Sequence, residues 1–231
     1  MPMPSVEIAW GGGKWNGGHK KAVRPFVESA LDMAREGIDA FGISVMLPKR
    51  AILWRASELY GDFGGANNAT DFELYVSPKD LKRRKIAKRT SELTVIAFHE
   101  LVHCVRNQHF DVCDLIELSA AEGLANTTEN KFAGMLLPKE EQVISGLDMV
   151  GEHAVNAARL VNELFEDAER EVTAEPQQAK KLFDKWFDGE PGILTQGATI
   201  GVLAVQKLLA EGQTIPSVMT MPAEDILATI L

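Results

Sequence analysis

One five-residue run, His99-Glu100-Leu101-Val102-His103, constrains this chain more than any other feature, because it lies in a segment with the apolar spacing of a helix. Side chains four residues apart lie on one face of a helix, so His99 and His103 can converge on one zinc ion. Glu100 lies beside them, where its carboxylate can take a proton from a water that the metal activates. The chain has only five histidines, so this spacing predicts a metal centre with Glu100 as its general base.

The composition is that of a globular chain and disfavours several classes of function. Apolar residues make up 45% of the 231 residues and charged residues 25%, enough for a sizeable core. The net charge of −9 disfavours a nucleic-acid or anionic-membrane partner. No signal peptide, membrane span or disulfide framework is visible, since Cys104 and Cys113 are the only cysteines. We therefore expect a cytoplasmic protein, and the sequence indicates no oligomeric state.

Apolar periodicity predicts a mixed first half and an all-helical second half. Alternation and turn residues favour strands at 6–10, 41–47 and 72–76, a further strand within 51–60, and a turn at 61–65. We expect one helix from about Pro25 to Gly37, and a second, capped by Thr90 or Ser91, that carries the histidine motif. Later helices are expected at about 113–130, 139–171, 177–187, 196–211 and 222–230.

A basic run, Lys79–Arg89, precedes the motif helix and contains seven Lys or Arg residues and one Asp. Such a run can bind nucleic acid or another anionic partner. It is more often a solvated helix face, and the acidic remainder of the chain favours that interpretation.

A catalytic zinc needs a third protein ligand beside an open position, and two residues compete for this role. His109, six residues after His103, has the spacing of the third histidine of the metzincin signature. That signature needs a glycine where this chain has Arg106. Glu122 lies on the expected following helix among Ala and Leu residues, where a buried carboxylate needs a compensating charge. We favour Glu122, because it requires no break in the helix at Arg106.

Three segments around the motif carry a resemblance to a known family. They are 99–106 (His-Glu-Leu-Val-His-Cys-Val-Arg), 114–117 (Asp-Leu-Ile-Glu) and 122–125 (Glu-Gly-Leu-Ala). Together they are similar to a bacterial family of predicted zinc-dependent proteases, catalogued as a domain of unknown function. The stretch from Gly64-Gly65 to Ser77-Pro78 and the late helix with Gly197 and Gly201 are similar as well.

This resemblance implies a gluzincin-type fold with His99, His103 and Glu122 as the metal ligands. At one position the chain departs from the family pattern. A tyrosine follows the late glycine in the family, whereas Ala198 follows Gly197 here. If that tyrosine stabilises the oxyanion, another group must replace it or the activity is weak.

Several further residues are candidates for supporting roles in such an enzyme. His153, Tyr75 and Arg106 are candidate donors to a developing oxyanion, although His153 also suits a surface position, Tyr75 the core and Arg106 an ion pair. Asn126, one turn beyond Glu122, is a candidate to orient a ligand histidine.

Gluzincins pair an extended substrate with an edge strand above the metal. The strand Phe72–Val76, with Leu74 and Tyr75 at its centre, is the candidate for that role in this chain. The substrate would then be a peptide or protein whose specificity pocket the sequence does not identify.

These observations favour an α+β chain with a zincin-like fold. We expect one metallopeptidase domain over 1–231, with a mixed N-terminal lobe at about 1–108, a helical lobe at about 109–231 and the active site between them. The expected function is peptide hydrolysis with Zn²⁺ as cofactor. The alternatives are a non-catalytic zincin that binds or regulates a partner, and an anionic-partner binder acting through Lys79–Arg89.

Overall fold

A computed structural model describes residues 6–12, 15–43, 50–55, 63–67, 71–76, 86–111, 114–136, 156–188 and 194–231. Most of these residues are helical, and one small sheet accompanies them, which confirms the α+β class. The chain divides into two compact units, residues 1–108 with 131–143, and residues 109–130 with 144–231. No helix within the described ranges is long and apolar enough to cross a membrane.

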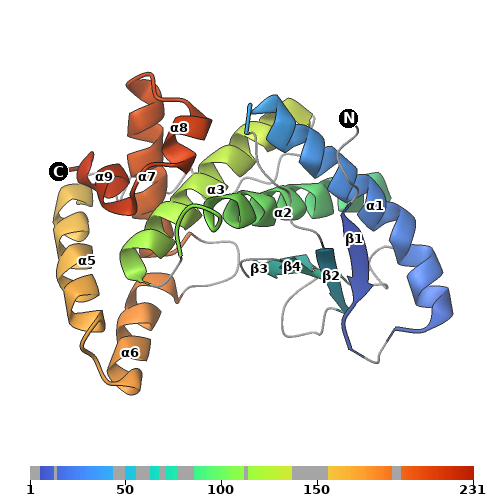
Figure 1. Cartoon of the computed structure of the whole chain (residues 1–231), viewed down its shortest axis with the longest axis horizontal. Helices are drawn as coiled ribbons and strands as arrows, with labels where there is room; N and C mark the ends of the chain where they lie inside the picture. Colours follow the sequence, from blue (N-terminus) through green and yellow to red (C-terminus); the bar gives the residue numbers. More distant parts are fainter. Residues whose placement is uncertain are drawn as a thin grey trace. The chain divides into compact units, whose positions relative to one another are not determined.

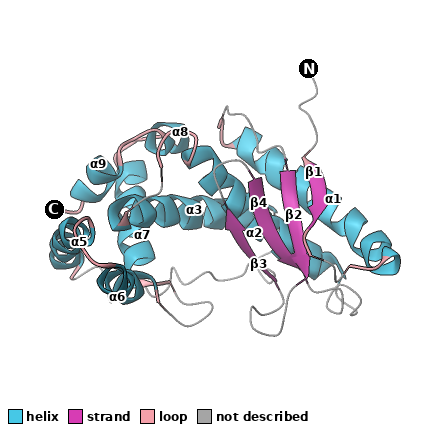
Figure 2. Cartoon of the chain, turned by 60° about the horizontal axis from the view of Figure 1, so that its bottom comes forward, coloured by secondary structure: helices cyan, strands magenta, loops and turns pink. Residues whose placement is uncertain are grey.

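The first unit contains a four-stranded mixed sheet (Figure 2). Its strands are β1 (Glu7–Trp10), β2 (Arg50–Arg55), β3 (Phe63–Asn67) and β4 (Asp71–Val76), arranged in the order β1-β2-β4-β3. Strands β1, β2 and β4 are parallel, and β3 runs antiparallel to β4. Alternate side chains of β4 are fully buried, so one face of the sheet contributes to the core.

Two long helices accompany this sheet, α1 (Gly17–Ala40) and α2 (Ile86–Arg106). They pack against each other, and α2 also contacts β3 and β4 (Figure 1). Helix α1 buries one stripe of side chains at helical spacing, including Val23, Val27, Ala30, Leu31, Ala34 and Ile38. The helix with the histidine motif is therefore held against the sheet by an apolar core.

Helix α1 begins at Gly17 and not near Pro25, so the predicted start of this helix is wrong. Asn16 caps it, and the side-chain oxygen of Asn16 accepts a 2.8 Å hydrogen bond from the backbone N–H of His19. Pro25 lies inside the helix. The predicted strand 41–47 also fails at its start, because Phe41 and Gly42 form the turn after α1, and residues 44–47 lie outside the described ranges.

Helix α2 begins at Ile86, so Thr90 and Ser91 lie inside it and do not cap it. The hydroxyl of Thr94 donates to the carbonyl oxygen of Thr90 at 2.8 Å, which satisfies this polar side chain within the helix. The predicted turn at 61–65 is wrong from Phe63 onward, because β3 begins there.

The described elements of the second unit are all helices. They are the part of α3 (Leu115–Leu136) up to residue 130, α5 (Ala157–Glu171), α6 (Pro176–Phe187), α7 (Gln196–Ala210), α8 (Ile215–Met219) and α9 (Ala223–Ala228). Helix α7 contacts α5, α6, α8 and α9 (Figure 1). Most of its residues are buried. Helix α8 was not expected from the sequence, although Thr214 as a cap and Pro216 in the first turn are its signals.

Two glycines bring the backbones of α3 and α7 into direct contact. A Cβ atom at Gly123 would overlap the backbone of Gly201, and a Cβ atom at Gly201 would overlap the carbonyl oxygen of Ser119. No other residue type fits at either position without a shift of a helix.

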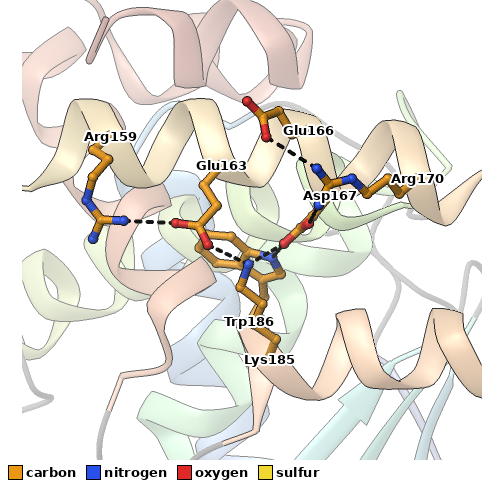
Figure 3. Close-up of polar contacts among 7 residues, drawn as sticks. All are labelled: Arg159, Glu163, Glu166, Asp167, Arg170, Lys185 and Trp186. Atoms are coloured by element: carbon orange, nitrogen blue, oxygen red, sulfur yellow. Dashed lines mark hydrogen bonds and ion pairs between the residues drawn. The ribbon is translucent and has the colours of Figure 1, made fainter.

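A buried carboxylate, Asp167, joins α5 to α6 (Figure 3). It accepts hydrogen bonds from Nζ of Lys185 at 2.5 Å, from Nε1 of Trp186 at 3.0 Å and from Nη1 of Arg170 at 3.0 Å. Burial alone would raise the pKa of Asp167, but the hydrogen bonds from Lys185 and Trp186 and the nearby positive charges outweigh it, so its pKa is lowered.

Candidate metal centre

The histidine motif lies in the last two turns of α2, as the sequence predicts. His103 is 5% exposed and Glu100 is 7% exposed, so the motif does not lie on a solvated face of the helix. The Nε2 atoms of His99 and His103 are 3.0 Å apart. Two nitrogens bound to one tetrahedral zinc at about 2.0–2.1 Å lie roughly 3.3 Å apart, so the two imidazoles are already spaced as ligands of one ion.

Glu122 of α3 completes a set of three ligand atoms. One atom from each of His99, His103 and Glu122 lies within 4.8 Å of the other two, and this group could hold a metal ion. Among the described residues no other trio of His, Cys, Asp or Glu meets the same criterion. Two imidazoles and one carboxylate are the ligand types of a catalytic zinc and leave a fourth position for water or substrate.

His109, the competing third ligand, does not join this group. Helix α2 continues through Arg106, and the backbone N–H of Asn107 still donates to the carbonyl oxygen of His103 at 2.9 Å. The chain therefore makes no sharp turn at Arg106, and His109 lies exposed in the turn that follows.

Cys104, next to His103, is a buried thiol and does not belong to the group of three ligand atoms. Burial, followed by the negative charges of Glu100 and Asp71, raises its pKa to about 12. The thiol therefore packs as a small buried hydrophobic side chain. Cys113 lies outside the described residues.

Strand β4, the candidate substrate strand with Leu74 and Tyr75, lies inside the sheet. Its backbone pairs with β2 on one side and with β3 on the other, so the prediction that Phe72–Val76 forms an edge strand is wrong. Leu74 is fully buried, and the hydroxyl of Tyr75 donates to Oε2 of Glu73 at 3.2 Å. The strand beside β4, β3, has a neighbour on one side only within the described chain.

The remaining candidates divide into described and undescribed residues. Arg106 is fully buried on α2, one turn beyond His103. His153 lies outside the described residues. Of the basic run Lys79–Arg89, only the backbone of its last four residues, as the first turn of α2, lies within them.

Asn126 contacts Glu122, the third residue of this group. Its Nδ2 atom donates to the backbone oxygen of Glu122 at 2.8 Å and to Oε2 of Glu122 at 3.2 Å. The N–H groups of this amide therefore face Glu122, and the expectation that Asn126 orients a ligand histidine stays a prediction.

Comparisons with known proteins assign neither a family nor a function to this chain. No protein-family model, no curated protein and no solved structure matches the chain.

Proposed function

We propose that this chain is a zinc-dependent metallopeptidase with His99, His103 and Glu122 as metal ligands and Glu100 as general base. The observation that carries the proposal is the convergence of these three ligand atoms within 4.8 Å beside a buried glutamate. The residues fit zinc by type and number, and iron, cobalt or manganese would accept the same donors.

The reaction would divide between the metal and Glu100. When bound, zinc supplies Lewis acidity, which polarises the scissile carbonyl and brings the pKa of a water molecule toward neutrality. Glu100 would accept the proton of the attacking water and pass it to the leaving amine. As a buried carboxylate next to one of the ligand histidines, Glu100 is suited to this transfer.

Strand β3 replaces β4 as our candidate for the substrate strand. Within the described chain β3 is an edge strand, it runs antiparallel to its neighbour and it contacts the helix that carries the motif. Its outer backbone groups suit an extended peptide that adds to the sheet.

A small mixed sheet with an antiparallel edge strand beside the metal helix also supports the zincin-like fold that the family resemblance implies.

The test is a pair of matched glutamine substitutions on α2. We expect Glu100→Gln to keep zinc bound at about one ion per chain and to lower peptide cleavage by at least about 100-fold, because the base is lost and the ligands remain. Glu92→Gln, about two turns earlier on the same helix, should change cleavage less than about threefold. Cleavage of a mixed peptide library, read by mass spectrometry, measures both, and a Glu100→Gln protein that still cleaves would refute the assigned base.

A non-catalytic zincin is the second candidate, and Ala198 favours it. This residue occupies the position where the family has a tyrosine, lies in the first turn of α7 and is 4% exposed, so it brings no hydroxyl group to an oxyanion. Wild-type protein with one zinc per chain that cleaves no member of the library would favour this candidate.

A further inference from the structure

Asn126 lies one helical turn after Glu122 on α3, so the two side chains share a face of the helix. Its amide nitrogen carries two N–H groups, and the two acceptors are both atoms of Glu122, the backbone oxygen at 2.8 Å and Oε2 at 3.2 Å. At 8% exposure, Asn126 is shielded from competing water. The bond to the backbone oxygen fixes the amide, and the fixed amide then directs its second N–H group at the carboxylate.

The chemistry of the acceptors determines the orientation of this amide. A carbonyl oxygen and a carboxylate oxygen both accept hydrogen bonds, so the NH₂ group must face them, and the reverse orientation would place Oδ1 against two acceptors. Because the donor is neutral, it holds the carboxylate without adding a positive charge that would repel a divalent cation.

We infer that Asn126 is a positioning residue for the metal centre: it holds Oε2 of Glu122 so that Oε1 serves as the single ligand oxygen. The inference rests on the proposed metal centre and adds to it a monodentate carboxylate that is oriented before the ion arrives. An unrestrained glutamate loses side-chain conformational entropy when it binds a metal. The hydrogen bond from Asn126 already restricts the rotamers of Glu122, so metal binding costs less of this entropy.

The experiment measures zinc affinity by competition with a chromophoric chelator, so it does not depend on catalysis. We expect Asn126→Ala to weaken zinc binding by about 10- to 100-fold, the usual effect of removing a group that orients a metal ligand. Asn130→Ala is the matched control. Nδ2 of Asn130 donates to the backbone oxygen of Asn126 at 2.7 Å one turn further on, and the variant should bind zinc within about twofold of wild type.

A double-mutant cycle separates positioning from a general weakening of α3. In a Glu122→Ala background, Asn126→Ala should lower zinc affinity less than about twofold further, because the group it positions is gone. A full-sized additional loss in that background, or wild-type affinity for Asn126→Ala alone, would overturn the inference while leaving the metal centre intact. A wild-type chain that takes up no zinc would instead overturn the metal centre itself.

Discussion

At the scale of single residues, Asp167 shows how the second unit keeps a buried charge. Its three donors come from both helices of the α5–α6 pair, and two of them are cations whose other side faces solvent (Figure 3). The third, the Nε1 atom of Trp186, belongs to a fully buried ring and has Asp167 as its acceptor. The carboxylate of Asp167 therefore accepts a hydrogen bond from the indole N–H of Trp186, which water does not reach.

We predict that Asp167→Ala lowers the free energy of unfolding by about 2 kcal/mol, because it leaves the indole N–H of Trp186 buried without its acceptor. Arg159→Ala removes the exposed ion pair with Glu163 and should cost no more than about 0.5 kcal/mol. Urea unfolding of both variants measures the difference, and equal costs would contradict this account.

The same cluster gives the stability a pH dependence with a definite sign. The pKa of Asp167 is lowered, so its contribution is complete above the unfolded value near 3.8 and disappears as the pH falls through the folded value. The pKa of Lys185 is raised, against the effect of burial, by its hydrogen bonds to Asp167 and Glu163, so its contribution disappears only as the pH rises through a folded value above 10.5. The difference between wild type and Asp167→Ala should therefore shrink below about pH 4.

The sequence was informative at this scale where spacing determines geometry. His99 and His103 had to share a face of any helix that contained them, and Glu122 needed only a second helix beside them. The hydrogen-bond partner of Asn126 could not be predicted from the sequence, because a side-chain amide one turn after Glu122 can face Glu122 or a different residue. Only the distances to Glu122 distinguish these two cases.

At the scale of elements, the crossing of α3 and α7 requires two glycines. We predict that Gly201→Ala destabilises the protein by about 1–3 kcal/mol, because the added methyl group overlaps the carbonyl oxygen of Ser119 and forces the helices apart. Gly134→Ala, at an exposed position in the last turn of α3 with no atom near its Cβ position, should stabilise the protein by up to about 1 kcal/mol. Thermal unfolding of the two variants should shift in opposite directions, and a stabilised Gly201→Ala protein would refute the close crossing.

Helix starts were the least predictable feature of the elements, for a physical reason. Pro25 lacks an N–H group and favours a first turn, but the cap at Asn16 and the buried stripe of α1 outweigh that local preference. Thr90 and Ser91 have side chains that favour the N-cap position of a helix, but α2 begins before them at Ile86. Strand order depends on contacts between distant segments, so β4 was identified as a strand while its interior position was not.

At the scale of the whole molecule, a metal bound only by the folded chain must stabilise it. With free zinc at 100 times the dissociation constant, linkage gives about 2.7 kcal/mol, which for a chain of this length is a rise in Tm of roughly 5–10 °C. His99→Ala should lose this rise, and His109→Ala should keep it, because His109 lies outside the ligand group. Differential scanning fluorimetry with and without zinc makes the measurement, and a rise lost in His109→Ala would contradict the ligand assignment.

The contact between Gly123 and Gly201 also limits how relatives of this chain can diverge. A side chain on a helix surface can change when a neighbouring side chain changes with it, but a Cβ atom where two backbones touch fits only if one of the helices shifts. Proteins that share this crossing should therefore retain the same two glycines long after the rest of their sequences have become dissimilar. Because Gly123 directly follows Glu122, distant homologues that share the proposed metal centre should show a glutamate followed by the glycine of the helix crossing.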